Sequence, residues 1–203
     1  TLDQTLASWL SLALGGLRAV SDLKRVLQQL PKNKTLLELQ LTVAGVISEA
    51  FKEFGVIPVV VGGSAVEFYT LGNYTTRDID LIVEDPEYIK SVMNGLGFCN
   101  DAGTWYLPEN PSIVVEFPKG PLAGDRKRIQ PLLLPNNHTA YLISLEDIII
   151  DRTLAAKYWT DGSEEWVRFM MVAHYDEIDW KYLRRVAKQE LCLDTLDKAR
   201  NWA

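Results

Sequence analysis

The segment VGGSA at residues 61–65, followed by RDIDL at residues 77–81, decides the fold of this chain. The apolar run at 57–61 leads into two glycines and predicts a strand. Residues 64–71 predict a helix, and residues 78–83 predict a second apolar strand. The order of strand, glycine turn, helix and strand therefore indicates an α/β unit.

The two aspartates of the second strand lie on one face of the expected sheet. Successive strand side chains point to opposite faces, so Asp78 and Asp80 are about 6.6 Å apart on the same face. Carboxylates at that spacing are ligands for hard divalent cations such as Mg²⁺. Gly62 and Gly63, just before a helix, offer backbone N–H groups and the positive end of the helix dipole to a phosphate. Ser64 is either an N-cap residue only or a contact for the β- and γ-phosphates. A phosphate site beside two metal-binding carboxylates outlines a site for nucleotidyl transfer.

This pattern resembles the signature of the polymerase-β-like nucleotidyltransferase superfamily, in which Gly-Ser at a helix start precedes an Asp-x-Asp or Asp-x-Glu strand. It is similar to the minimal prokaryotic members, including those of toxin–antitoxin and abortive-infection systems. Residues 144–156 resemble the helix that opens the C-terminal part of these proteins, where Lys or Arg often occupies the position of Arg152. The resemblance covers about residues 55–175. It implies an NTP donor, bound with Mg²⁺ or Mn²⁺, whose phosphates contact Gly62–Ser64 and Arg152.

A third carboxylate is common on a neighbouring strand in this superfamily, and Glu116 is the candidate here. It lies near the end of residues 112–117, an otherwise apolar segment that predicts a strand. Such a carboxylate would bind metal with Asp78 and Asp80, and would position or deprotonate the attacking hydroxyl. Asp125, in the following loop, is the alternative. A structural role for Glu116 would place it at the rim of the sheet.

The rest of the chain is mostly helical by pattern. Apolar residues at helical spacing predict helices at 3–30, 36–54, 85–93 and beyond 144, and short strands are expected at 104–107 and 112–117, with a loop at 118–131. Tyr158, Trp159 and Trp166 are expected to pack in the core. The predicted fold is α/β (α+β), a short mixed sheet flanked by helices. The predicted regions are a helical lead-in at 1–35, a nucleotidyltransferase core at 36–143 and a helical C-terminal region at 144–203.

The composition indicates a globular protein and argues against some classes of function. The chain is 47% hydrophobic and 24% charged, which is typical of a globular protein, and its net charge of −6 argues against a general nucleic-acid coating protein. The run Asp125 to Arg128 is a solvated loop or a basic lip for an acceptor. The sequence contains no run of eighteen consecutive apolar residues, so it predicts no membrane span. The apolar N-terminus lacks the basic start of a signal peptide, so we expect a cytoplasmic protein.

Two functions fit these observations. The first is a metal-dependent nucleotidyltransferase that moves an NMP from an NTP to a hydroxyl of RNA (such as a tRNA end), protein or a small molecule. The second is a binding partner, such as an antitoxin, that keeps the fold without turnover. The position of Glu116 distinguishes them, because an enzyme needs it beside the aspartates. The N-terminal helices are a candidate surface for a homodimer or a partner protein.

Overall fold

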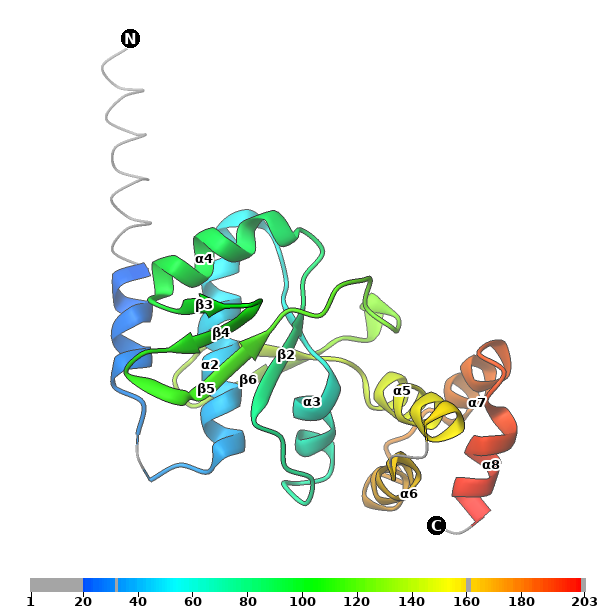
Figure 1. The fold of residues 1–203 in the computed structure, drawn as a ribbon. Coiled ribbons are helices and arrows are strands. Elements are labelled where there is room, and N and C mark those ends of the chain that lie inside the picture. Colours follow the sequence, from blue (N-terminus) through cyan, green and yellow to red (C-terminus); the bar gives the residue numbers. More distant parts are fainter. Residues whose placement is uncertain (1–19, 32, 160–161, 202–203) are drawn as a thin grey trace.

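The structure, a computed structural model, describes residues 20–31, 33–159 and 162–201. Its centre is a mixed seven-stranded sheet with the strand order β3-β4-β5-β2-β1-β7-β6 (Figure 1). The strands are β1 (Val59–Val60), β2 (Asp78–Ile82), β3 (Cys99–Asp101), β4 (Thr104–Leu107), β5 (Asn110–Glu116), β6 (Gln130–Leu133) and β7 (Thr139–Leu142). The α/β class predicted from the sequence is therefore confirmed.

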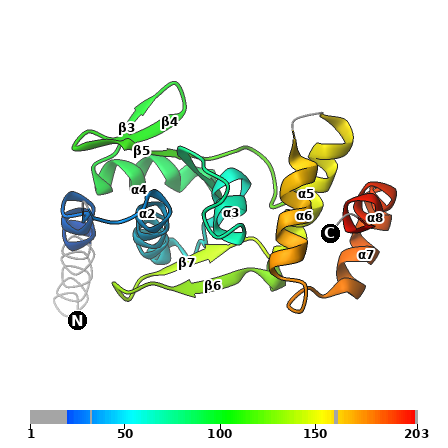
Figure 2. The same ribbon diagram turned by 90° about the horizontal axis from the view of Figure 1, so that it is seen from below.

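Helices cover this sheet and extend beyond it. Residues 20–28 are helical, and the longer helices are α2 (Leu36–Phe51), α3 (Gly62–Tyr69), α4 (Ile89–Leu96), α5 (Leu145–Tyr158), α6 (Ser163–Ala173), α7 (Trp180–Gln189) and α8 (Leu193–Asn201). The described ranges also contain three short 3-10 helices: η1 (Lys52–Phe54), η2 (Pro86–Tyr88) and η3 (Arg126–Arg128). The two ends of the sheet lie on either side of α2, whereas α5 to α8 form a group beside α3 (Figures 1 and 2).

Strand β2 is the centre of the sheet and the one that carries the Asp-x-Asp pattern. It pairs antiparallel with β1 and parallel with β5. Its alternate residues Ile79 and Leu81 are 1% and 0% exposed and belong to the main core, so the aspartates face the opposite side. The sheet thus buries one face of β2 and leaves the other for the site.

Local sequence signals explain why the elements begin where they do. Thr35 and Glu38 form a reciprocal capping box at the start of α2, satisfying two backbone N–H groups. Gly62 has φ 57°, in the left-handed region that favours glycine, and this lets the chain turn directly from β1 into α3. Helix α3 begins two residues earlier than the apolar pattern predicts, because the glycines are part of it.

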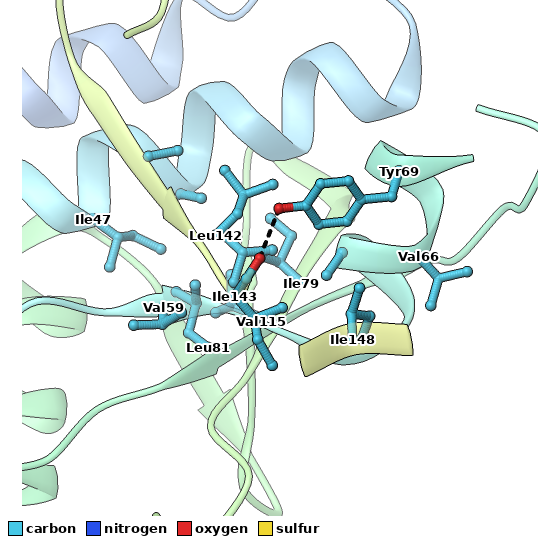
Figure 3. Close-up of a cluster of buried hydrophobic side chains, with 14 of the residues drawn as sticks. Ile47, Val59, Val66, Tyr69, Ile79, Leu81, Val115, Leu142, Ile143 and Ile148 are labelled. Atoms are coloured by element: carbon cyan, nitrogen blue, oxygen red, sulfur yellow. Dashed lines mark hydrogen bonds between the residues drawn. The ribbon is translucent and has the colours of Figure 1, made fainter. Parts of the chain in front are cut away.

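A buried cluster joins the sheet to the C-terminal helices (Figure 3). Ile79 and Leu81 of β2 lie in the same apolar cluster as Ile148 of α5. The Tyr69 hydroxyl of α3 donates a 2.8 Å hydrogen bond to the carbonyl oxygen of Ile143. Burial raises the pKa of this phenol, which keeps it a hydrogen-bond donor. The start of α5 is therefore fixed against the sheet.

Several sequence expectations need correction. Strands β3, β6 and β7 were not predicted, and β6 overlaps the loop expected at 118–131. Tyr158 and Trp159 are 62% and 66% exposed rather than buried, while Trp166 packs partly buried against the core as expected.

The N-terminal helix predicted at 3–30 is described only from residue 20. Leu23 and Leu27 are buried in the main core, so this part of the helix packs within the chain. The remainder, residues 1–19, lies outside the described residues, and the predicted docking surface there stays a prediction. None of the helices in the described ranges is both long and apolar enough to cross a membrane.

Candidate active site

Three carboxylates converge on the side of the sheet opposite the core. Parallel pairing of β2 with β5 sets Asp80 directly opposite Glu116. One carboxylate oxygen from each of Asp78, Asp80 and Glu116 lies within 4.8 Å of the others, and all three residues are half-buried. The sheet therefore brings together the three residues that the sequence singled out as metal ligands.

The glycine turn lies against this carboxylate group. A methyl group at Gly62 would collide with a carboxylate oxygen of Asp80, so only glycine leaves room for that side chain. The backbone N–H of Gly63 donates to the same carboxylate. The amide at the start of α3 is thus directed into the site, as the sequence predicted.

Ser64 has a different immediate partner. Its side chain is buried, and its hydroxyl donates a 2.7 Å hydrogen bond to the backbone carbonyl of Asp78. In this arrangement Ser64 ties helix α3 to the start of strand β2. This contact keeps Asp78 at a fixed distance from the glycine turn, and a phosphate contact for Ser64 stays a prediction.

Burial and the crowding of three carboxylates change the pKa of Asp80. Burial, together with the charges of Asp78 and Glu116, raises the pKa of Asp80 from 3.8 to about 6. The Gly63 N–H and the positive charge of Arg152 act in the opposite direction but do not cancel the rise. A divalent cation would offset this crowding of negative charge, and the oxygen-only ligand set suits Mg²⁺ or Mn²⁺.

Two threonines hold the carboxylates in place, and sequence reasoning missed both. The Thr76 hydroxyl donates to Asp78 Oδ1 at 2.7 Å, and the Thr104 hydroxyl donates to Glu116 Oε1 at 3.0 Å. Thr104 lies on β4, which pairs antiparallel with β5. No signal in the sequence marks Thr104, because its relation to Glu116 depends on the register of two strands.

The Thr76 segment is itself anchored by buried polar groups. Glu67, only 4% exposed, accepts a 3.0 Å hydrogen bond from the Thr76 backbone N–H, and Gln40 donates to the Thr76 carbonyl at 3.1 Å. A buried carboxylate and a buried amide therefore fix the chain just before β2. This anchoring limits the movement of Asp78.

Arg152 lies on α5 and is paired with its neighbour. Its guanidinium bonds the Asp151 carboxylate, with the shortest contact at 2.6 Å. Its charge also acts on Asp80, so α5 presents a cation to the site. The predicted phosphate contact of Arg152 is compatible with this position.

Asp125, the alternative third carboxylate, is not part of the carboxylate group formed by the described residues. Its side chain accepts the Lys127 N–H and caps η3, while its backbone N–H donates to Asp147 at 3.1 Å. Asp147 is 2% exposed and also accepts hydrogen bonds from the Ser144 hydroxyl at 2.8 Å and the Tyr182 hydroxyl at 2.7 Å. The geometry therefore favours Glu116 over Asp125 as the third carboxylate.

Three convergent carboxylates on a mixed sheet, beside a glycine turn that opens a helix, define a site of the nucleotidyltransferase class. A family model described as "Nucleotidyltransferase of unknown function (DUF6036)" matches residues 35–202. The chain belongs to this family. No curated protein sequence matches the chain.

Two solved structures are similar to this one. An antigenic nucleotidyltransferase-like protein from Paracoccidioides brasiliensis has a TM-score of 0.51 at 16% identity, covering 79% of this chain and 92% of its own. The antibiotic-resistance factor ANT(2'')-Ia has a TM-score of 0.46 at 14% identity, covering 82% of this chain and 96% of its own. At 16% identity, the similarity to the Paracoccidioides brasiliensis protein shows a shared fold and no more.

Proposed function

We propose that this protein transfers an NMP unit from an NTP to a hydroxyl group in a reaction that depends on a divalent metal. The observation that carries this proposal is the convergence of Asp78, Asp80 and Glu116 beside the Gly62–Gly63 turn. Membership of a nucleotidyltransferase family supports the same chemistry.

Each residue of the site has a role in this proposal. Asp78, Asp80 and Glu116 would hold the cation, and bound Mg²⁺ or Mn²⁺ would neutralise phosphate charge and lower the pKa of the attacking hydroxyl. The positive end of the α3 dipole, at the Gly62–Gly63 turn, would face a donor phosphate. Arg152 would add a positive charge from α5. Most of the catalytic effect would be positioning and electrostatics.

In the proposed transfer step one P–O bond forms, one P–O bond breaks and one proton is released. The acceptor oxygen forms a bond to the α-phosphorus as the bond to the pyrophosphate oxygen breaks. The hydroxyl proton passes to Glu116 or, through it, to water. Thr104 would hold Glu116 in the orientation that accepts this proton. The Thr104 hydroxyl donates to Oε1 of Glu116, so Oε2 is left to accept the proton.

The alternative is a partner protein, such as an antitoxin, that retains the fold without turnover. That function requires no placement of Glu116 near the aspartates, yet its carboxylate lies within 4.8 Å of both. This observation favours the enzyme. A role in toxin–antitoxin or abortive-infection systems, the cytoplasmic location and the three sequence regions stay predictions.

The experiment that tests the proposal is incubation of the protein with each labelled NTP and Mg²⁺ or Mn²⁺, together with total cell RNA and protein. We expect a labelled product from the wild type and none from Asp78→Asn, which removes one metal ligand. The matched control is Asp176→Asn, which changes an exposed acid in the turn between α6 and α7, and it should label normally. A product of equal intensity from Asp78→Asn would overturn the assignment.

A further inference from the structure

Two basic segments that are far apart in the sequence lie side by side in the fold. The first is η3 and the second is α7, and Arg128 of η3 stacks over the Tyr182 ring of α7 at 4.0 Å from its centroid. A cavity of about 320 Å³ lies between them. It is lined by Asp125, Arg128, Asp179, Lys181, Tyr182 and Arg185. The run noted in the sequence therefore contributes Asp125 and Arg128 to the wall of a cavity.

The negative groups in this cavity already have partners. Asp125 accepts the Lys127 N–H at 3.0 Å, and Asp179 accepts the Tyr182 N–H at 3.0 Å at the start of α7. Asp179 also bonds Arg128 at 3.4 Å. These two carboxylates thus act as helix caps, which explains their presence in a basic cavity.

Two cations in the cavity are not neutralised in this way. Lys181 and Arg185 are exposed, and neither has an ion-pair partner within 4.0 Å among the residues that the structure describes. They are four residues apart on α7, so they project from the same side of the helix. Arg185 also lies 5.2 Å from the centroid of the Tyr182 ring, which fixes its guanidinium near the cavity. The pair is suited to an anionic group.

The cavity continues toward the candidate active site. A second cavity of about 510 Å³ shares Asp125, Tyr182 and Arg185 with the first and extends along α5 to Asp151. Asp151 is bonded to Arg152, the cation whose charge acts on Asp80. An extended ligand held at Lys181 and Arg185 therefore has a route along α5 to the residue next to Arg152.

We propose that this surface binds the phosphodiester backbone of a polynucleotide acceptor, with Lys181 and Arg185 contacting phosphate groups. This inference rests on the proposed function, because it names the class of acceptor for that reaction. Regularly spaced negative charges suit a surface with free cations along one helix face, whereas a neutral small molecule would not need them. A polynucleotide also carries terminal hydroxyls that an NMP can be transferred to.

The test compares Lys181→Gln/Arg185→Gln with the wild type and with Lys90→Gln/Lys198→Gln, which removes the same charge from exposed positions on α4 and α8. Binding of short single-stranded RNA and of DNA of the same sequence is measured by fluorescence anisotropy over a range of salt concentrations. We expect the affinity of the first variant to fall about 10- to 50-fold at 0.1 M salt, and the slope of log affinity against log salt to decrease by about 1.4. The control variant should bind like the wild type.

Transfer of label from NTP identifies which polynucleotide is the acceptor, and separates failure of this inference from failure of the proposed function. The inference is supported if the wild type labels RNA or DNA and the Lys181→Gln/Arg185→Gln variant labels it less. Equal polynucleotide binding by all three proteins, or label found only in protein or a small molecule, overturns the inference and leaves the transferase function standing. Binding that requires the pair, without transfer to any acceptor, supports the binding surface and overturns the proposed function.

Discussion

Replacement of Asp80 by Asn should make the metal-free protein more stable while removing its response to metal. The pKa of Asp80 is raised from 3.8 to about 6 by burial and by the neighbouring carboxylates. A carboxylate with a raised pKa in the folded state favours folding fully below its unfolded pKa, and this contribution is lost as the pH rises through about 6. At neutral pH the ionised Asp80 therefore costs the wild type stability. The uncharged amide of the Asp80→Asn variant avoids that cost while its oxygen still accepts the Gly63 N–H.

The magnitude follows from the rise in the pKa of Asp80 from 3.8 to about 6, which corresponds to at most about 3 kcal/mol. Asp80 is only half-buried, so screening by solvent reduces the expected gain to about 1–2 kcal/mol. For a chain of this size that is an increase in Tm of about 2–8 °C above pH 7. Near pH 4 the difference should be small, because Asp80 is then largely protonated in the folded state.

The assay is thermal unfolding of the wild type and of Asp80→Asn, with chelator and with excess Mg²⁺, at about pH 4 and about pH 8. Magnesium should raise the Tm of the wild type at the higher pH, and should have little effect on the variant. Asp176→Asn, which removes an exposed charge from the turn between α6 and α7, is the control and should behave like the wild type. An Asp80→Asn protein that is no more stable than the wild type without metal, or that responds equally to Mg²⁺, would refute the reasoning.

Three further outcomes are expected. Glu116→Gln should reduce transfer by about 10²- to 10⁴-fold while NTP binding, measured by calorimetry, persists; a solvent-exposed rim residue would give no such loss. Thr104→Val should lower kcat by about tenfold at an unchanged KM for NTP, because the variant lacks the hydroxyl that orients Glu116. Thr104→Ser keeps a hydroxyl and should have the wild-type kcat. An equal loss of kcat in both variants would indicate a packing role for Thr104. Gly62→Ala should weaken Mg²⁺ binding and destabilise the fold by about 1–2 kcal/mol, since its φ is left-handed and the methyl group would collide with Asp80; unchanged Mg²⁺ affinity would show that Asp80 does not need that space.

The sequence was sufficient for the centre of the fold because its signals are local. Alternation along β2 places Asp78 and Asp80 on one face, and the glycines mark the turn into α3 whatever the rest of the chain does. Glu116 could be proposed because the superfamily resemblance implies a third carboxylate on a neighbouring strand, and Glu116 is the carboxylate near the end of an otherwise apolar segment. The placement of the aspartates and of the glycine turn needs only the backbone geometry of a few consecutive residues.

Other features depend on contacts between distant segments and could not be inferred in this way. Thr104 meets Glu116 only through the register of β4 with β5. Strand β6 contains Pro131, which is depleted in strands, and it is tolerated here because β6 is at the edge of the sheet. Trp159 is exposed although its side chain is large and apolar, because it follows the end of α5, outside the packed helical face.

The three hydrogen bonds accepted by Asp147 have a consequence for the exchange of backbone hydrogens with solvent. Asp125 is in an exposed loop, yet its N–H is bonded to a carboxylate that is 2% exposed. A methyl group at Gly124 would lie 2.6 Å from that carboxylate, so the loop fits there only through glycine. Releasing the Asp125 N–H would leave a buried charge short of a donor, at a cost of about 1–3 kcal/mol. This amide should therefore exchange slowly for a surface loop, and the segment after Glu116 should open with the C-terminal helices rather than by itself.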